Sequence, residues 1–341
     1  MLTQTVGEAS FFSPGGSSLL FHKKLEIMMK LFLGWFMLLA MSIFMLGFFF
    51  HIQKVQLWHP WKESPTQTWE ISQMQRKLIL NSTCMKYNLT NQAKRLNPHV
   101  AYQLFVMPSH KIIFCSVPKA GCSNWKRIFL LLAMNMTNET NALDNENINR
   151  SSVLMNIHST PLLRRLISYP SMQQLELLNN YTKMMFTRDP FERLVSAYRD
   201  KLLHVNPAYT ERFINPIKAA FQKSLTSEEK VTFQEFVNFI LQEKMNDVHW
   251  RPMYKVCDPC RIRYDIIGKL ETLNQDAAGL LRSFGVPEGL HYPTFKKHKT
   301  EPRTNEQITK EYLEKLSEKQ IEQLFKLYEI DFSMFNYLSN I

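Results

Sequence analysis

The sequence predicts an α/β domain with a central, largely parallel sheet flanked by helices, preceded by one transmembrane helix. Two observations predict this class. Short β-branched segments alternate with amphipathic helical segments from about residue 96 onward, and a long apolar run lies before residue 51. The chain has 341 residues, 45% of them hydrophobic, so it is long enough to bury a substantial core.

The apolar run Leu31–Phe50 is the predicted membrane segment. Its 20 residues carry no charge, and a helix of that length spans roughly 30 Å of hydrocarbon. Lys23, Lys24 and Lys30 lie before the run, whereas Lys54 alone follows closely. Because basic residues gather on the cytoplasmic side, we expect the N-terminus in the cytoplasm and the rest of the chain beyond the membrane.

These features divide the chain into four parts. We expect a cytoplasmic tail at 1–30, a signal-anchor helix at 31–50, a luminal stem at 51–95 and one globular domain at 96–341. The density of N-x-[ST] glycosylation sequons beyond the membrane segment favours a secretory lumen. The six sequons begin at Asn81, Asn88, Asn135, Asn138, Asn149 and Asn180.

The net charge indicates the kind of partner, and the cysteines bear on disulfide bonds. A formal net charge of +11 predicts an anionic partner, but it does not distinguish nucleic acid, glycan, nucleotide and membrane surface. The odd number of cysteines, five, leaves at least one thiol free or bonded to another chain. In "CDPC", Cys257 and Cys260 favour a local disulfide over half a zinc site, because no second pair completes the site.

The first strand–loop–helix unit carries the stretch "CSVPKAGCSNWKR". A strand at 111–117 leads through a tight turn at 118–121 into a helix that begins near Cys122. The helix buries an apolar stripe that starts at Trp125 and has the i, i+3, i+4, i+7 spacing. The turn directs unpaired N–H groups and the helix dipole at one point, which favours an anion. Lys119 adds a charge there, although a plain turn remains the alternative, and no Walker A sequence is present.

The second unit repeats this arrangement. A strand at 181–187 ends before Arg188, and Asp189 and Pro190 are suited to cap and begin a helix that runs to about residue 203. Arg188 can bind a phosphate through two hydrogen bonds, and Ser196 follows on the helix. The alternative is that Arg193 and Arg199 pair with Glu192 and Asp200 on a solvated helix, and for Arg199 we expect this pairing.

Further elements complete the predicted domain. A third strand is expected at 264–270, followed by a helix at 274–284. "TFQE" at 232–235 and "SEKQ" at 317–320 are capping boxes that open two more helices.

The motifs "VPKAGCSNWKR" and "RDPFERLVSAYRDK" resemble the two nucleotide-binding loops of Golgi carbohydrate sulfotransferases. The similar branch is the HNK-1, N-acetylgalactosamine 4-O and chondroitin/dermatan 4-O sulfotransferase family. The segments 249–273 and 330–337 also resemble it, and the likeness covers about residues 100–341. It implies a P-loop-like sulfotransferase fold for the globular domain and 3′-phosphoadenylyl sulfate (PAPS) as co-substrate, without a metal.

The resemblance assigns the two loops to the two ends of PAPS. The 5′-phosphosulfate would be held by Pro118, Lys119, Ala120, Gly121, Cys122, Ser123 and Asn124. The 3′-phosphate loop comprises Arg188, Asp189, Pro190, Phe191, Glu192, Arg193, Leu194, Val195 and Ser196, with Arg188 and Ser196 as its phosphate ligands. Many sulfotransferases have Thr in place of Cys122, so Ser123 and the backbone would supply that hydrogen bond here.

Lys119 and one of two histidines are the expected catalytic residues. Lys119 would stabilise the charge that develops on the leaving phosphate oxygen. The acceptor hydroxyl needs a general base, for which His158 is the first candidate, His249 the second and Glu192 the third.

The acceptor implied by the resemblance is an anionic or N-acetylgalactosamine-containing glycan, with the O4 hydroxyl first and glucuronate O3 as the alternative. The segment 202–230 is expected to contact it, nucleic acid is not expected, and a homo-oligomer is left open. The location would be the Golgi membrane, single-pass type II, with a luminal catalytic domain. A membrane-tethered kinase and a non-catalytic luminal glycan-binding protein are the competing functions.

Overall fold

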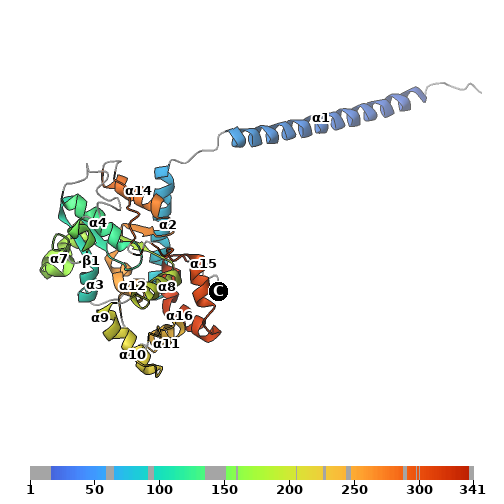
Figure 1. The fold of residues 1–341 in the computed structure, drawn as a ribbon. Helices are drawn as coiled ribbons and strands as arrows, with labels where there is room; N and C mark the ends of the chain where they lie inside the picture. Colours follow the sequence, from blue (N-terminus) through green and yellow to red (C-terminus); the bar gives the residue numbers. More distant parts are fainter. Residues whose placement is uncertain are drawn as a thin grey trace, which may run out of the picture. The chain divides into compact units, whose positions relative to one another are not determined.

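The computed structural model describes residues 17–58, 65–90, 96–134, 151–158, 160–204, 206–225, 228–242, 247–286, 290–296, 298 and 300–337. The chain divides into two units, Met1–Ser64 and Pro65–Ile341 (Figure 1). Three of the predicted glycosylation sites, Asn135, Asn138 and Asn149, lie outside the described residues.

The first unit consists of the helix α1, Ser17–Trp58. Its segment Lys23–Gly47 is long and apolar enough to cross a membrane, with a mean hydropathy of 2.0. Large side chains such as Phe32, Trp35 and Phe44 are each 75% exposed on it. A helix that is apolar on all sides is suited to hydrocarbon, in agreement with the predicted membrane segment.

A five-stranded sheet in the order β3-β1-β2-β4-β5 forms the centre of the second unit. β2 (Ile112–Cys115), β4 (Thr182–Thr187) and β5 (Ile266–Lys269) run parallel. β1 (Leu104–Met107) pairs antiparallel with β2, and β3 (Arg164–Arg165) pairs antiparallel with β1. The sheet is therefore mixed: its parallel strands are the three predicted ones, and the antiparallel edge was not predicted.

Both faces of the sheet are buried, as expected when helices cover a parallel sheet. Successive strand residues alternate between two apolar clusters, because side chains in a strand point to opposite faces. Phe114 and Phe186 belong to the cluster that contains Trp125, whereas Ile113 and Met185 belong to the other. Trp125 is fully buried, which confirms that it starts the core face of its helix.

Helices surround the sheet (Figure 1). Their bounds are α2 Pro65–Lys86, α3 Pro98–Gln103, η1 Pro108–His110, α4 Cys122–Ala133, α6 Ser152–Met155, η2 Leu166–Ser168, α7 Ser171–Asn180, α8 Pro190–Lys201, α9 Pro207–Tyr209, the π-helix η3 Thr210–Ile214, α10 Asn215–Ala220, α11 Phe233–Leu241, α12 Met253–Cys257, α13 Pro259–Ile262, α14 Leu273–Ser283, α15 Glu306–Leu313 and α16 Glu318–Met334. The predicted capping boxes at the starts of α11 and α16 are both present.

The second unit begins at Pro65, well before the predicted domain start at residue 96. The reason is α2, which lies beside α14 (Figure 1) and is integrated into the fold. Trp69 is 8% exposed and packs so closely on Gly279 that an added Cβ there would come within 2.5 Å of the indole. Arg76 donates to Asp276 at 2.8 Å and to the carbonyl of Ile267, the latter a residue of the central sheet, at 2.7 Å. Most of the expected stem is thus part of the domain.

Two disulfides join segments far apart in the sequence. Cys84 of α2 pairs with Cys260, and Cys115 of β2 pairs with Cys257. The expected local Cys257–Cys260 disulfide is therefore wrong: Asp258 adopts a left-handed conformation between α12 and α13, and each cysteine meets a partner on another element. Cys122 is the free thiol that the odd cysteine count required.

Candidate functional site

The loop between β2 and α4 has the geometry of an anion site. Two of its residues have positive φ, Lys119 at 69° and Gly121 at 79°, and α4 begins at Cys122 as predicted. Gly121 cannot be replaced without strain, because an added Cβ would lie 2.5 Å from the hydroxyl oxygen of Tyr292. At the first turn of α4, the N–H groups of Cys122 and Ser123 have no acceptor within the described part of the chain.

Lys119 is held in an ion pair at the end of α8. Its Nζ lies 3.1 Å from Asp200 Oδ2, and Lys201 Nζ lies 3.2 Å from the same oxygen. Burial lowers the pKa of Lys119, while Asp200 opposes that shift. Burial would raise the pKa of Asp200, but the two ammonium groups outweigh this and hold it below its usual value. The ion pair with Asp200 thus holds the Lys119 ammonium group beside the mouth of α4.

Arg188 joins the second loop to the first. Its side chain is 6% exposed, and its Nη1 donates to the carbonyl of Lys119 at 3.2 Å. Nη2 donates to the carbonyl of Thr304 at 2.5 Å, while Nε and Nη2 each lie 3.3 Å from Glu192 Oε2. Since a guanidinium has five N–H donors and four are engaged in these contacts, one remains for a ligand.

Arg193 has a different position from the one expected of a phosphate ligand. It is 1% exposed and donates to the backbone carbonyls of Pro118, Val248 and Arg251 at 2.7–3.0 Å. The sequence predicted that Arg193 would contact the bound nucleotide or pair with an acidic neighbour, whereas its N–H groups bond to backbone carbonyls. Arg193 thus connects the loop before α4 to the segment around residue 250.

The remaining residues of the second loop either form the start of α8 or pack in the apolar core beside it. Asp189 is the N-cap of α8, and its Oδ1 accepts the N–H groups of Phe191 and Glu192 at 2.9 Å each. Phe191, Leu194 and Val195 are buried in an apolar cluster, and Pro190 is the first helical residue. Ser196 is half-buried, and its hydroxyl makes no hydrogen bond within the described residues.

His158 makes two hydrogen bonds to α4. Its Nε2 lies 2.9 Å from Ser123 Oγ, and its Nδ1 lies 3.2 Å from Lys126 Nζ. Partial desolvation and the nearby cations, Lys126 foremost, lower the pKa of His158 to about 3. The imidazole is therefore neutral near pH 7, but both of its nitrogens are occupied.

His249 is bound to a buried carboxylate. Its Nδ1 lies 2.6 Å from Asp247 Oδ1, and its backbone N–H donates to the same oxygen at 2.9 Å. The Tyr209 hydroxyl lies 2.8 Å from His249 Nδ1 and donates to Asp247 Oδ1 at 3.3 Å. Burial lowers the pKa of His249, although Asp247 opposes that shift, so the neutral ring donates from Nδ1 and keeps a free electron pair on Nε2.

The three predicted catalytic residues share a charged neighbour, Lys201, which indicates that they lie in one region of the fold. Lys201 lowers the pKa of Lys119, of His158 and of His249, and His249 contributes to the shift of His158. The parallel pairing of β2 with β4 brings the loops of Lys119 and Arg188 to the same edge of the sheet, because loops that follow parallel strands emerge on one side. The site can hold an anion that has two charged ends, next to a neutral histidine.

A family model described as "Sulfotransferase family" matches residues 102–338. The chain belongs to the sulfotransferase family. It is 35% identical to carbohydrate sulfotransferase 8 of Mus musculus over 275 residues, 78% of this chain and 64% of that relative. It is 36% identical to carbohydrate sulfotransferase 9 of Homo sapiens over 81% of this chain and 62% of that relative. Carbohydrate sulfotransferase 11 of Rattus norvegicus is 32% identical, over 83% of this chain and 80% of the relative.

The matched region includes every predicted site residue, but not α1 or α2. The alignments cover less than two thirds of the length of the first two relatives. No solved structure matches the chain.

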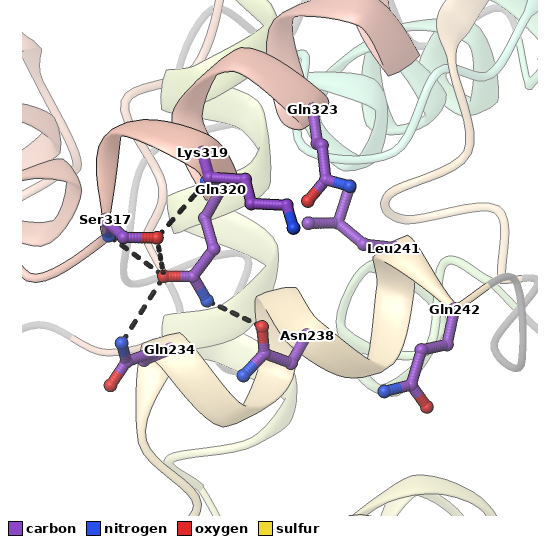
Figure 2. A pocket seen from close by; sticks show the side chains of 8 residues that line it. All are labelled: Gln234, Asn238, Leu241, Gln242, Ser317, Lys319, Gln320 and Gln323. Carbon is purple, nitrogen blue, oxygen red and sulfur yellow. Dashed lines mark hydrogen bonds between the residues drawn. The ribbon is translucent and has the colours of Figure 1, made fainter.

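A separate pocket between α11 and α16 is explained by helix packing. It has a volume of about 450 Å³, and Figure 2 shows the Gln320 amide at its centre. That amide donates to Asn238 at 2.7 Å and accepts from Gln234 and from the backbone N–H of Ser317. These amides bind one another and join the two helices, and no predicted site residue lines the pocket.

Sequence reasoning missed three partners in the site. Asp247 lies two residues before His249, and this Asp-x-His spacing could have been noticed. Asp200 was expected to pair with an arginine of α8, whereas it pairs with Lys119. The third partner, the carbonyl of Thr304, is a backbone group, so no residue type in the sequence could have indicated it.

Proposed function

We propose that the protein transfers a sulfuryl group from PAPS to a sugar hydroxyl of a glycan. The observation that carries this proposal is the hydrogen bond from Arg188 to the carbonyl of Lys119, which joins two strand-to-helix loops into one anion site. Family membership supports the reaction class, and the family implies PAPS as the sulfate donor. A nucleotide that carries anionic groups at two separate places matches two loops, each with its own cation.

The site residues fit such a sulfate donor. Residues 118–124 would hold the 5′-phosphosulfate, because the N–H groups of Cys122 and Ser123 have no other described acceptor. Arg188 and Ser196 would hold the 3′-phosphate, since one guanidinium N–H and the serine hydroxyl are uncommitted. Bound there, PAPS supplies an activated sulfuryl group.

His249 is proposed as the general base, ahead of His158. Asp247 holds the Nδ1 proton of His249, so Nε2 can take the proton of the acceptor hydroxyl. His158 is less suited, because Lys126 occupies its Nδ1 and Ser123 its Nε2. The acceptor oxygen forms a bond to sulfur as the bond from sulfur to the phosphate oxygen breaks, and adenosine 3′,5′-bisphosphate leaves. Lys119 stabilises the charge on that phosphate.

The acceptor is proposed as O4 of N-acetylgalactosamine, on the resemblance of the motifs to the branch that contains such enzymes. Glucuronate O3 is the alternative within the same branch. The segment 202–230 would contact the glycan: it contains Tyr209, which binds Asp247 beside the proposed base, and the exposed Arg212.

We further propose a Golgi membrane protein of type II, anchored by α1 with its catalytic domain in the lumen, which suits its carbohydrate sulfotransferase relatives.

The test is sulfate transfer from radiolabelled PAPS by the full chain in detergent. The acceptors are desulfated chondroitin, desulfated dermatan and oligosaccharides ending in N-acetylgalactosamine or glucuronate. We expect transfer by the wild type, its loss in Lys119→Ala, and its retention in Lys326→Ala, which removes an exposed lysine from α16. If the folded wild type neither transfers sulfate nor binds adenosine 3′,5′-bisphosphate, the protein is not a PAPS-dependent enzyme.

A further inference from the structure

A chain of hydrogen bonds runs from a buried ammonium group to the mouth of α4. Lys126 Nζ lies 3.2 Å from His158 Nδ1, and His158 Nε2 lies 2.9 Å from Ser123 Oγ. Ser123 and Lys126 are three residues apart on α4 and share one face of the helix. His158 comes from the segment after α6 and bridges the two.

The direction of this chain follows from the chemistry of its members. An ammonium group has donors only, so Lys126 donates and His158 Nδ1 accepts. The neutral imidazole then carries its proton on Nε2 and donates it to Ser123 Oγ. Because the serine oxygen already accepts a hydrogen bond there, its own O–H is left to donate elsewhere. The neighbouring N–H groups at the first turn of α4 open toward the proposed sulfate donor.

Lys126 is an unusual residue to bury at this place. It is 3% exposed and forms no ion pair within the described residues, while its Nζ lies 4.4 Å from the centre of the Phe105 ring. Burial lowers the pKa of Lys126 to about 8, so the group is mostly charged near pH 7. A buried cation without a carboxylate partner is costly, and its effect here is to fix the tautomer of His158.

We infer that His158 is a positioning residue, which Lys126 orients and which in turn fixes the Ser123 hydroxyl as a hydrogen-bond donor to the 5′-phosphosulfate of the sulfate donor. This inference rests on the proposed function. It also accounts for Cys122, a buried free thiol at the start of α4. A thiol is a weak donor. The serine that follows it supplies the hydroxyl hydrogen bond, and His158 holds that hydroxyl in place.

Two substitutions of His158 separate positioning from base catalysis. Glutamine can accept from Lys126 with its carbonyl oxygen and donate to Ser123 with its amide nitrogen, but it cannot act as a base. Alanine can do none of these. In the full chain we expect His158→Ala and Ser123→Ala each to raise the KM for PAPS by about 10- to 100-fold, the range for one hydrogen bond to a charged group. We expect His158→Gln to restore most of that loss with kcat near the wild-type value.

A double variant completes the test. If His158 acts through Ser123, the variant with both alanines has about the KM for PAPS of Ser123→Ala alone. The inference is overturned if His158→Gln lowers kcat 100-fold or more at an unchanged KM for PAPS, since His158 is then the base. An unchanged KM in both alanine variants also overturns it. Wild-type binding of adenosine 3′,5′-bisphosphate, measured by calorimetry, distinguishes these results from failure of the proposed function, in which the wild type itself does not bind.

Discussion

The substitution Asp247→Asn tests the proposed base. Asp247 is 8% exposed, and its Oδ1 accepts from Nδ1 and from the backbone N–H of His249 at 2.6 and 2.9 Å. An asparagine has almost the same shape, and its carbonyl oxygen can still accept both N–H groups, but it carries no negative charge. The imidazolium that forms when Nε2 takes the proton then loses the carboxylate that stabilises it.

The expected effect is on kcat. General base catalysis contributes about 10²- to 10⁴-fold, so kcat should fall by about that factor, which corresponds to about 2.7–5.4 kcal/mol of activation free energy. The KM for PAPS should stay near the wild-type value, because the residues proposed to hold PAPS follow β2 and β4. Tyr209→Phe is the matched control. It removes a 3.3 Å hydrogen bond to Asp247 and a 2.8 Å contact with His249 Nδ1 but keeps the carboxylate ion, and should cost about tenfold or less.

The assay is the initial rate of sulfate transfer from radiolabelled PAPS between pH 5 and pH 8. Burial lowers the pKa of His249 below its ordinary value of 6.5. Since a base must be unprotonated, wild-type kcat should be level above pH 6.5 and fall as the pH drops through the pKa of His249. If Asp247→Asn is folded and retains kcat within fivefold of the wild type, His249 is not the base and the proposed mechanism is refuted.

Replacing Trp69, which is 8% exposed, by alanine should lower the free energy of unfolding by about 3–5 kcal/mol, because α2 is part of the domain. Urea unfolding in detergent measures this change. An unchanged midpoint would mean that residues 65–95 are a stem outside the domain. Burial raises the pKa of Asp331 to about 6, above its value of 3.8 when unfolded, so this group's stabilising contribution is complete below pH 3.8 and falls by about 3 kcal/mol as the pH rises through 6. Unfolding at pH 4.5 and 7 should show a smaller difference in Asp331→Asn, and an equal difference would assign the pH dependence to other groups. Arg188→Lys loses the planar guanidinium and should weaken binding of adenosine 3′,5′-bisphosphate at least tenfold by calorimetry; unchanged affinity would place the 3′-phosphate elsewhere.

Much of the local structure could be predicted from the sequence. The strands around Phe114, Met185 and Ile267, the start of α4 at Cys122 and the Asp189 cap of α8 were all predicted and are present. Each depends on residues that lie within a few positions of one another: a short run of apolar side chains, a turn glycine, or a carboxylate that accepts nearby N–H groups. The length and apolarity that would let α1 cross a membrane are likewise properties of one continuous apolar run.

The tertiary structure decided what depends on residues that are distant in the chain. Four cysteines can pair in three ways, and the spacing of "CDPC" suggested the wrong one, because the partners Cys84 and Cys115 lie 176 and 142 residues away. His158 and His249 look alike as single histidines in the sequence. Their environments differ because His158 bonds to Lys126, 32 positions away on α4, whereas the partner of His249, Asp247, lies only two residues away and could have been noticed. A hydrogen bond fixes a tautomer only when its partner is within about 3 Å, and only the fold decides which residues meet at that distance.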